Sequence, residues 1–376
     1  MTKVLLIFGT RPEAIKLCPV LLHLRGRAEG FQVKCCVTAQ HREMLDQVLQ
    51  VFGVTPDYDL DLMLPGQTPA QTSARILAAL EGVIAAERPD MVLVQGDTTT
   101  TFCGALAAFY ARIPVGHVEA GLRTGDLGQP FPEELNRVLT TRMSALHFAP
   151  TEGAAENLRR DNVPAERILV TGNTGIDAVL QVTERLRTGG LAGAHLPGLD
   201  ASRRLLVVTA HRRENHGAPL EAVCDALTRL ARRGDVQIVY PVHRNPNVIG
   251  PVERMLGHEP NIILCPPLDY VSFIDLMRRA YLLITDSGGI QEEGPSLGKP
   301  VLVMREKTER PEAVEAGTVK LVGTCATRIV EETGLLLENR QEFERMSRAH
   351  NPYGDGHASE RIGNALAGCQ HLLRVV

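Results

Sequence analysis

The sequence has no marked excess of either charge and no long hydrophobic run. It contains 40 lysine and arginine residues against 44 aspartate and glutamate residues, which gives a formal net charge of −4. This balance provides no protein-wide field for nucleic acid or an anionic membrane, so an anionic ligand must be held by a local site. No apolar stretch reaches bilayer-spanning length, and the apolar residues 4–8 lead into Gly-Thr-Arg-Pro-Glu rather than a signal-cleavage site. We expect no nucleic-acid or membrane partner and a cytoplasmic location.

Paired cysteines and a dinucleotide fingerprint are also missing. The eight cysteines include no Cys-x-x-Cys pair, and no spacing of His and Cys matches a known set of metal ligands. Several cysteines lie in apolar runs, which favours reduced packing residues. No Gly-x-Gly-x-x-Gly follows a predicted strand, which argues against a tightly bound nicotinamide cofactor in the standard mode. We therefore expect neither a metal nor a cofactor.

What the chain does have is a regular alternation of apolar, β-rich runs with stretches of helical periodicity. This pattern is typical of parallel α/β layers, and 376 residues favour two domains over one. Two similar series of strands predict two doubly wound domains. The first series comprises residues 4–8, 32–37, 91–95, 114–118, 146–149 and 168–170, and the second comprises 205–208, 236–241, 262–264, 282–284, 301–304 and 320–322.

The expected N-terminal domain spans residues 1–171 and the expected C-terminal domain spans 172–358. A last helix within 359–376 is expected to pack back onto the first domain. The division falls at Thr-Gly-Asn-Thr-Gly, residues 171–175, a composition typical of a hinge. Ligands of open α/β sheets bind beyond the carboxyl ends of the strands, so we expect the two domains to face each other across a cleft.

The segment 285–293, Thr-Asp-Ser-Gly-Gly-Ile-Gln-Glu-Glu, follows an apolar run directly and is the most informative motif. A buried strand leads there into a turn of small residues and a helix start, whose free N–H groups suit a phosphate. Gly288 and Gly289 allow close approach of the phosphate, and Glu293 lies within reach of ribose hydroxyls. The alternative is an ordinary strand–turn–helix with a capping serine.

A second helix start follows the first strand, in Gly-Thr-Arg-Pro-Glu-Ala-Ile-Lys, residues 9–16. Pro12 suits the first helical position, and Arg11 and Lys16 would flank an anion there. The alternative is that Arg11 is only a surface charge. In the second half, His211 follows a strand together with Arg212, and it could donate to a diphosphate.

Three carboxylates follow strand ends or open a helix: Asp97, Glu119 and Glu133. Close carboxylates push their pKa values apart, which supplies an acid and a base at one pH. Two alternatives stay open. Asp97 could cap the following helix, and Glu133 could form a solvated ion pair with Arg137 at i and i+4. His243 in a Pro- and Asn-rich turn stays undecided, and Arg310, held extended by the following proline, could aim its guanidinium at the cleft.

Taken together, these blocks resemble the bacterial non-hydrolysing UDP-N-acetylglucosamine 2-epimerases. That family has the GT-B architecture of two Rossmann-like domains, and its members are usually homodimers. They convert UDP-N-acetylglucosamine reversibly into UDP-N-acetylmannosamine, a precursor for surface polysaccharides. The matching blocks are residues 9–16, 38–47, 96–101, 117–126, 285–293 and 350–356.

The resemblance implies roles for individual residues. Some family members also have a second, activating UDP-sugar site, at which Glu43 and Gly66 here replace a Gln and an Arg. The implied catalytic residues are Asp97, Glu119, Glu133, Arg137 and His211; the implied substrate-binding residues are Arg11, Lys16, Phe273, Ser287, Gly288, Gly289, Glu293 and Arg310; the implied second site comprises Gln40, Arg212 and His243.

The C2 proton of this sugar is not adjacent to a carbonyl group, so simple deprotonation and return is unfavourable. Two routes remain: transient oxidation by a bound nicotinamide, or loss of the anomeric leaving group. Because the chain lacks the dinucleotide-binding fingerprint, loss of the leaving group is favoured. We therefore expect elimination of UDP to 2-acetamidoglucal, followed by re-addition. The sequence leaves open which carboxylate serves which face. The rival functions are a hydrolysing 2-epimerase that releases UDP and N-acetylmannosamine, a GT-B glycosyltransferase and a non-catalytic UDP-sugar sensor.

Overall fold

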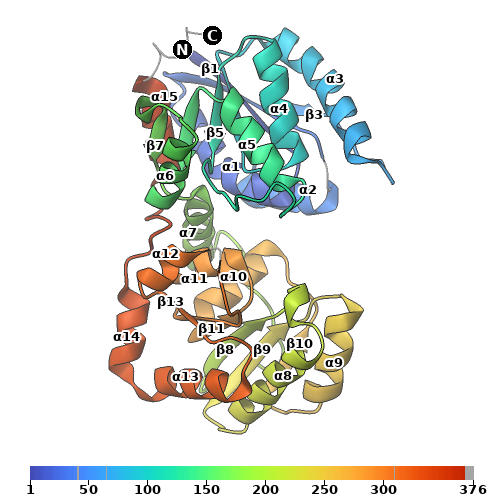
Figure 1. Cartoon of the computed structure of the whole chain (residues 1–376). Coiled ribbons are helices and arrows are strands. Elements are labelled where there is room, and N and C mark those ends of the chain that lie inside the picture. The colour runs from blue at the N-terminus through green and yellow to red at the C-terminus, as the bar shows by residue number, and fades with distance from the viewer. Residues whose placement is uncertain (40–41, 65, 309, 369–376) are drawn as a thin grey trace. The chain divides into compact units, whose positions relative to one another are not determined.

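A computed structural model describes residues 1–39, 42–64, 66–308 and 310–368. The chain forms two compact units (Figure 1). Unit 1 comprises residues 1–178 and the chain from residue 353 onward, and unit 2 comprises residues 179–352. The predicted boundaries at 171–172 and 358–359 lie close to these divisions. The first division falls inside helix α7 (Thr174–Arg187) rather than before it.

Unit 1 contains a parallel sheet of seven strands in the order β3-β2-β1-β4-β5-β6-β7. The central strand β1 is entirely apolar over Val4–Phe8 and fully buried there, as expected for a strand covered by helices on both faces. The strand order reverses between β1 and β4, the position at which ligands of doubly wound sheets bind. The strands are β1 (Thr2–Phe8), β2 (Phe31–Val37), β3 (Tyr58–Asp59), β4 (Met91–Gln95), β5 (Val115–Val118), β6 (Leu146–Ala149) and β7 (Ile168–Val170).

Several helices of unit 1 begin at recognisable caps. Thr10 and Thr68 each form a capping box with the residue three positions later and precede a proline in the first turn. The helices are α1 (Arg11–Arg25), α2 (Arg42–Phe52), α3 (Pro69–Glu87), α4 (Thr99–Tyr110), α5 (Glu133–Met143), α6 (Glu152–Arg160), α7 and α15 (Ala358–Gly368), with a 3-10 turn at Ala165–Arg167.

Unit 2 repeats this topology with six parallel strands in the order β10-β9-β8-β11-β12-β13, reversing between β8 and β11. Its strands are β8 (Arg204–Thr209), β9 (Val236–Pro241), β10 (Ile262–Cys265), β11 (Leu282–Thr285), β12 (Val301–Val303) and β13 (Val319–Leu321). Its helices are α8 (Ala218–Ala231), α9 (Pro246–Leu256), α10 (Tyr270–Arg279), α11 (Gly288–Ser296), α12 (Pro311–Glu315), α13 (Ala326–Glu338) and α14 (Arg340–Arg348), with a 3-10 turn at Arg213–Asn215.

The prediction of two Rossmann-like doubly wound domains is therefore confirmed. All twelve predicted strands are present, and β3 is the one that the sequence pattern missed, because two residues show no periodicity. Within the described residues, no helix is long and apolar enough to cross a membrane.

The helix α15 packs against α1 in unit 1 and is held at its start by a buried carboxylate. Asp177 of α7 is 2 % exposed and accepts hydrogen bonds from the backbone N–H groups of Ala358 (3.2 Å) and Ser359 (2.7 Å). Nearer the C-terminus of α15, Arg27 donates to the exposed side chain of Asn364 at 2.8 Å. Asp177 thus serves as the missing partner of helix-start donors that would otherwise be orphaned.

We expect Asp177→Ala to lower the free energy of unfolding by about 1–3 kcal/mol, because two buried backbone donors lose their acceptor. The matched control on α15 is Asn364→Ala, whose side chain is exposed and which should stay within about 0.5 kcal/mol of the wild type. Urea unfolding of the three proteins measures both values. Equal stability of Asp177→Ala and the wild type would contradict the assigned role.

Candidate active site

The carboxyl ends of β1 and β4 are joined by Glu13, a residue that the sequence analysis did not single out. Its Oε2 atom accepts the N–H groups of Gly9 (3.0 Å) and Thr10 (2.7 Å). Its Oε1 atom lies 2.7 Å from the hydroxyl of Thr98 and 3.0 Å from that of Thr101. Burial raises the pKa of Glu13, although the hydrogen bonds from Thr98 and Thr10 act against this. The starts of α1 and α4 are therefore fixed to each other.

Glu119 follows β5 and is held by two side chains. Lys16 of α1 forms an ion pair with its Oε1 atom, and the amide of Gln95 donates to its Oε2 atom. Its backbone has φ of +61°, in the left-handed region that non-glycine residues seldom adopt and that costs about 1–3 kcal/mol. A methyl group built on Gly96 would lie 3.8 Å from Oε2 of Glu119. Glu119 therefore lies beside the turn that carries Asp97.

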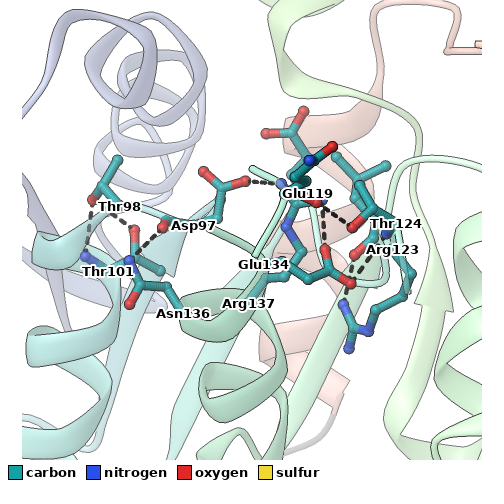
Figure 2. A network of polar contacts seen from close by, with 12 residues as sticks. Asp97, Thr98, Thr101, Glu119, Arg123, Thr124, Glu134, Asn136 and Arg137 are labelled. Carbon is teal, nitrogen blue, oxygen red and sulfur yellow. Dashed lines mark hydrogen bonds and ion pairs between the residues drawn. The ribbon is translucent and has the colours of Figure 1, made fainter. Parts of the chain in front are cut away.

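Two residues of α5 bind Asp97. Its Oδ2 atom lies 2.5 Å from Nη2 of Arg137, and its carbonyl group accepts a hydrogen bond from Asn136 at 2.9 Å (Figure 2). The N-cap of α4 is Thr98, whose hydroxyl accepts the N–H of Thr101, so the interpretation of Asp97 as the cap is wrong. The Asp97 carboxylate is thereby left for the Arg137 ion pair.

Glu134 extends this network away from Asp97 (Figure 2). It is 1 % exposed, its Oε2 atom lies 3.3 Å from Nη1 of Arg137, and its Oε1 atom accepts the N–H groups of Thr124 and Gly125. Arg137 therefore pairs with Glu134 and Asp97 rather than with Glu133, contrary to the alternative of an i, i+4 pair. Glu133 is half-buried on the first turn of the same helix, and within the described residues its carboxylate forms no hydrogen bond or ion pair.

His117 supports the same turn from β5. It is fully buried, and Nε2 lies 2.7 Å from the carbonyl oxygen of Gly96. Burial lowers the pKa of His117 to about 3, so the ring is neutral at pH 7 and its Nε2–H donates to Gly96. Gly96 itself has φ of +74°, which explains the need for glycine before Asp97.

In unit 2 the central feature is Asp286, which directly follows β11 and is fully buried. Its Oδ2 atom accepts the backbone N–H groups of His211 and Arg212, both at 2.8 Å, and the side-chain amide of Asn215 at 3.1 Å. Its Oδ1 atom lies 3.1 Å from Nδ1 of His211. The Asp286 carboxylate therefore fixes the backbone of the turn after β8.

The start of α11 is surrounded by cationic groups. A methyl group built on Gly288 would lie 3.8 Å from Nη2 of both Arg212 and Arg310. The N-cap Ser287 makes no side-chain capping bond, and Nε of Arg212 is buried with no hydrogen-bond partner among the residues that the structure describes. Arg310 is held in place by an ion pair with Glu292. A helix start with two guanidinium groups can bind a phosphate or diphosphate.

The other predicted residues lie as follows. His243 stacks on His211 with ring centroids 5.7 Å apart and planes 20° apart. Oε1 of Glu293 would lie 3.9 Å from a methyl group built on Gly289. Phe273 is half-buried on the first turn of α10. Arg11 is exposed at the first position of α1, and Gln40 lies outside the described residues.

The structure thus brings the predicted residues together in two groups. In unit 1, Lys16, Glu119, Asp97 and Arg137 lie at the carboxyl ends of β4 and β5. Around the ends of β8 and β11, unit 2 gathers His211, Arg212, Arg310 and the glycines of α11. Two Rossmann-like units, one with carboxylates paired to cations at its strand ends and one with a helix start flanked by two guanidinium groups, define a protein of GT-B type.

Comparison with known proteins identifies the family. The sequence model of the UDP-N-acetylglucosamine 2-epimerase family matches residues 24–367. A Salmonella typhimurium UDP-N-acetylglucosamine 2-epimerase is 58 % identical over 369 residues, which cover 97 % of this chain and 98 % of the relative. The Neisseria meningitidis UDP-GlcNAc 2-epimerase, solved bound to UDP-GlcNAc, is 47 % identical with a TM-score of 0.86, covering 98 % of this chain and 100 % of that one. The solved structure of a Listeria monocytogenes protein, described there as a putative UDP-N-acetylglucosamine 2-epimerase, has a TM-score of 0.92 at 46 % identity. The match covers 98 % of this chain and 96 % of that one. The chain belongs to the UDP-N-acetylglucosamine 2-epimerase family, and the predicted GT-B-type fold is confirmed.

Because His117 is buried and neutral, we expect the free energy of unfolding to depend on pH in the acid range. Its folded pKa of about 3 lies below the ordinary value of 6.5. The stability it contributes is therefore complete above pH 6.5 and falls as the pH drops towards 3, by about 1.4 kcal/mol per pH unit. His117→Gln keeps a donor for the Gly96 carbonyl and should lose this slope. Urea unfolding between pH 7.5 and 4.5 measures it; parallel pH profiles of variant and wild type would show that His117 does not titrate on unfolding.

Proposed function

We propose that this protein catalyses the reversible epimerisation at C2 of UDP-N-acetylglucosamine to UDP-N-acetylmannosamine without net hydrolysis. The observation that carries the proposal is the cluster of Asp97 and Glu119, each paired with a cation, at adjacent strand ends. Binding a nucleotide alone gains nothing from carboxylates. Acid–base chemistry needs them, because a proton must leave one face of a carbon and return to the other.

Unit 2 is proposed to bind the UDP moiety. The diphosphate would contact the N–H groups of α11 at Ser287, Gly288 and Gly289, with Arg310 and His211 supplying positive charge. We further propose Glu293 for the ribose, Phe273 for the uracil and Arg11 of unit 1 as an added cation. The convergence of Arg212 and Arg310 on Gly288 supports this assignment.

The proposed reaction has two mirrored halves. A carboxylate among Asp97, Glu119 and Glu133 takes the C2 proton, the C1–O bond breaks, and its electron pair leaves with UDP as the C1=C2 double bond of 2-acetamidoglucal forms. The phosphate oxygen then adds back to C1 while a protonated carboxyl group delivers a proton to the other face of C2. Lys16 and Gln95 orient Glu119, and Arg137 orients Asp97. The cationic groups of unit 2 stabilise the departing charge, which is usually the largest catalytic effect.

The product would supply surface polysaccharide synthesis from the cytoplasm. A second UDP-sugar site at Gln40, Arg212 and His243 also stays a proposal. The stacking of His243 on His211 supports a position beside the first site.

A homodimer is supported by an exposed apolar groove of unit 1 between α3 and α4. Ile84 and Tyr110 line it, and the side chains of Tyr110 and the neighbouring Phe109 are 73 % and 48 % exposed. Glu81 and Arg88 lie in the same groove two helical turns apart. In an antiparallel pairing of two α3 helices about a twofold axis, Glu81 of one copy would face Arg88 of the other, so the surface is complementary to itself.

The central experiment is incubation of the protein with UDP-N-acetylglucosamine alone in D2O, followed by NMR. We expect both C2 epimers of the UDP-sugar, with deuterium at C2. Product without deuterium at C2 after full turnover would refute proton exchange. Free N-acetylmannosamine would identify a hydrolysing enzyme, a requirement for an acceptor would identify a glycosyltransferase, and tight binding without turnover would identify a sensor.

The control variant for this experiment is Asp97→Asn. It removes the charge of one carboxylate in unit 1 and leaves the residues of unit 2 unchanged. We expect turnover to fall by about 100-fold or more while UDP affinity, measured by calorimetry, stays close to that of the wild type.

We expect Tyr110→Glu to convert a dimer into a monomer, because a charge would be buried at the centre of the apolar contact. Light scattering after size exclusion measures the mass. Leu335→Glu, at an apolar side chain of α13 in unit 2 that is 40 % exposed, is the matched control and should leave the mass unchanged. A dimeric Tyr110→Glu protein would place the interface elsewhere.

A further inference from the structure

Asp286 is a buried charge that the predicted sites did not include. Its side chain is fully buried and three donors converge on its Oδ2 atom, two from the backbone of His211 and Arg212 and one from Asn215. Burial alone would raise the pKa of Asp286, but the hydrogen bonds from His211 and Arg212 outweigh it and hold the pKa below the ordinary value of 3.8. The side chain is therefore an anion at neutral pH, with Oδ1 facing Nδ1 of His211 at 3.1 Å.

This contact decides which nitrogen of His211 carries the proton. The two atoms form an ion-pair contact, and because a carboxylate can only accept, a hydrogen on Nδ1 is the arrangement that avoids repulsion between lone pairs. Nε2 is then the nitrogen presented outward, from a side chain that is 37 % exposed. In the neutral ring Nε2 has only a lone pair, so His211 can donate to a phosphate through Nε2 only as the imidazolium cation.

With the substrate bound, the Asp286 carboxylate on one side and the diphosphate on the other would stabilise such a cation at His211. His243 stacks on it, and two stacked imidazolium rings would repel each other. The N–H of Asn245 donates to Nδ1 of His243 at 3.1 Å, so that nitrogen acts as an acceptor and carries no hydrogen. Arg212 and Arg310 add positive charge nearby, and Asp286 is the carboxylate that compensates it at His211.

We propose that Asp286 is a positioning residue that fixes His211 with Nδ1–H towards its own carboxylate and Nε2–H towards the diphosphate of the substrate. This inference rests on the proposed elimination of UDP. During that step the electron pair of the C1–O bond moves onto a phosphate oxygen, and the imidazolium Nε2–H donates a hydrogen bond to it. The proton is held by His211 throughout, so none is consumed. Triads of Ser, His and Asp use a carboxylate in the same way to fix a histidine tautomer.

The decisive variant is Asp286→Asn, which keeps the shape and removes the charge. The three donors that converge on Oδ2 will keep an oxygen at that position, so the new amide nitrogen must face His211. It then donates to Nδ1 and forces the proton of the neutral ring onto Nε2. Nitrogen-15 NMR of the full-length protein with labelled histidine distinguishes the two tautomers, and His211→Gln assigns the signal by its loss.

We expect protonated Nδ1 at His211 in the wild type and the reversed tautomer in Asp286→Asn. In that variant Nε2–H still faces the phosphate but belongs to a neutral ring, so the departing charge loses a cationic donor; kcat should fall by about 10-fold or more, while the Kd for UDP changes by less than about 10-fold. The matched control is Tyr240→Phe. The buried hydroxyl of Tyr240 donates to the carbonyl of Ala210 at 3.1 Å, so its removal loosens the same turn without changing its charge. It should keep the wild-type tautomer and a kcat within about threefold.

Three outcomes overturn the inference: an Nε2–H tautomer of neutral His211 in the wild type, an unchanged tautomer in Asp286→Asn, or a reversed tautomer with wild-type kcat. The wild-type spectrum alone suffices if Asp286→Asn fails to fold. If the wild-type protein binds UDP but shows no epimerisation, the proposed function fails instead, and the ring nitrogens still report whether Asp286 fixes His211.

Discussion

The backbone N–H groups that follow the central strands β1 and β8 donate to buried carboxylates rather than to a neighbouring strand. Glu13 accepts those of Gly9 and Thr10 after β1, and Asp286 accepts those of His211 and Arg212 after β8. An unpaired buried donor costs about 1–3 kcal/mol, so these turns are fixed by the requirement for an acceptor. The side chains proposed for chemistry extend from the turns that these acceptors hold.

The fold could be predicted from the sequence because its signals are local. Every expected strand is an apolar run, and several helices begin with a Thr cap or with Pro in the first turn. Two series of such strands and helices are enough to predict two doubly wound units. The exact site network could not be predicted in the same way. Glu13, Glu134 and Asp286 are acidic residues in turns and helices, where a surface position is the usual outcome. Their burial depends on donors far away in sequence, such as Thr98 for Glu13.

Some signals were nevertheless present. The pattern Thr10-x-x-Glu13 is a capping box, which indicates that Glu13 faces its own helix start. In Asp97-Thr98, either residue could cap α4, and the structure selects Thr98 because Arg137 takes the aspartate. The partner of Arg137 on its own helix was misjudged for a similar reason: Glu134 at i−3 is buried beside it, while Glu133 at i−4 is half-buried. The roles of these residues in catalysis stay predictions.

The convergence of Arg212 and Arg310 on Gly288 has a practical consequence for work with this protein. Two guanidinium groups that approach the same glycine repel each other, and any small oxyanion placed between them relieves that repulsion. Sulfate, phosphate and citrate in purification or crystallisation buffers would therefore compete with the nucleotide that we propose to bind there. Nucleotide affinities measured in different buffers would then differ according to how much of the site those ions occupy. A buffer that contains no such oxyanion is the appropriate reference.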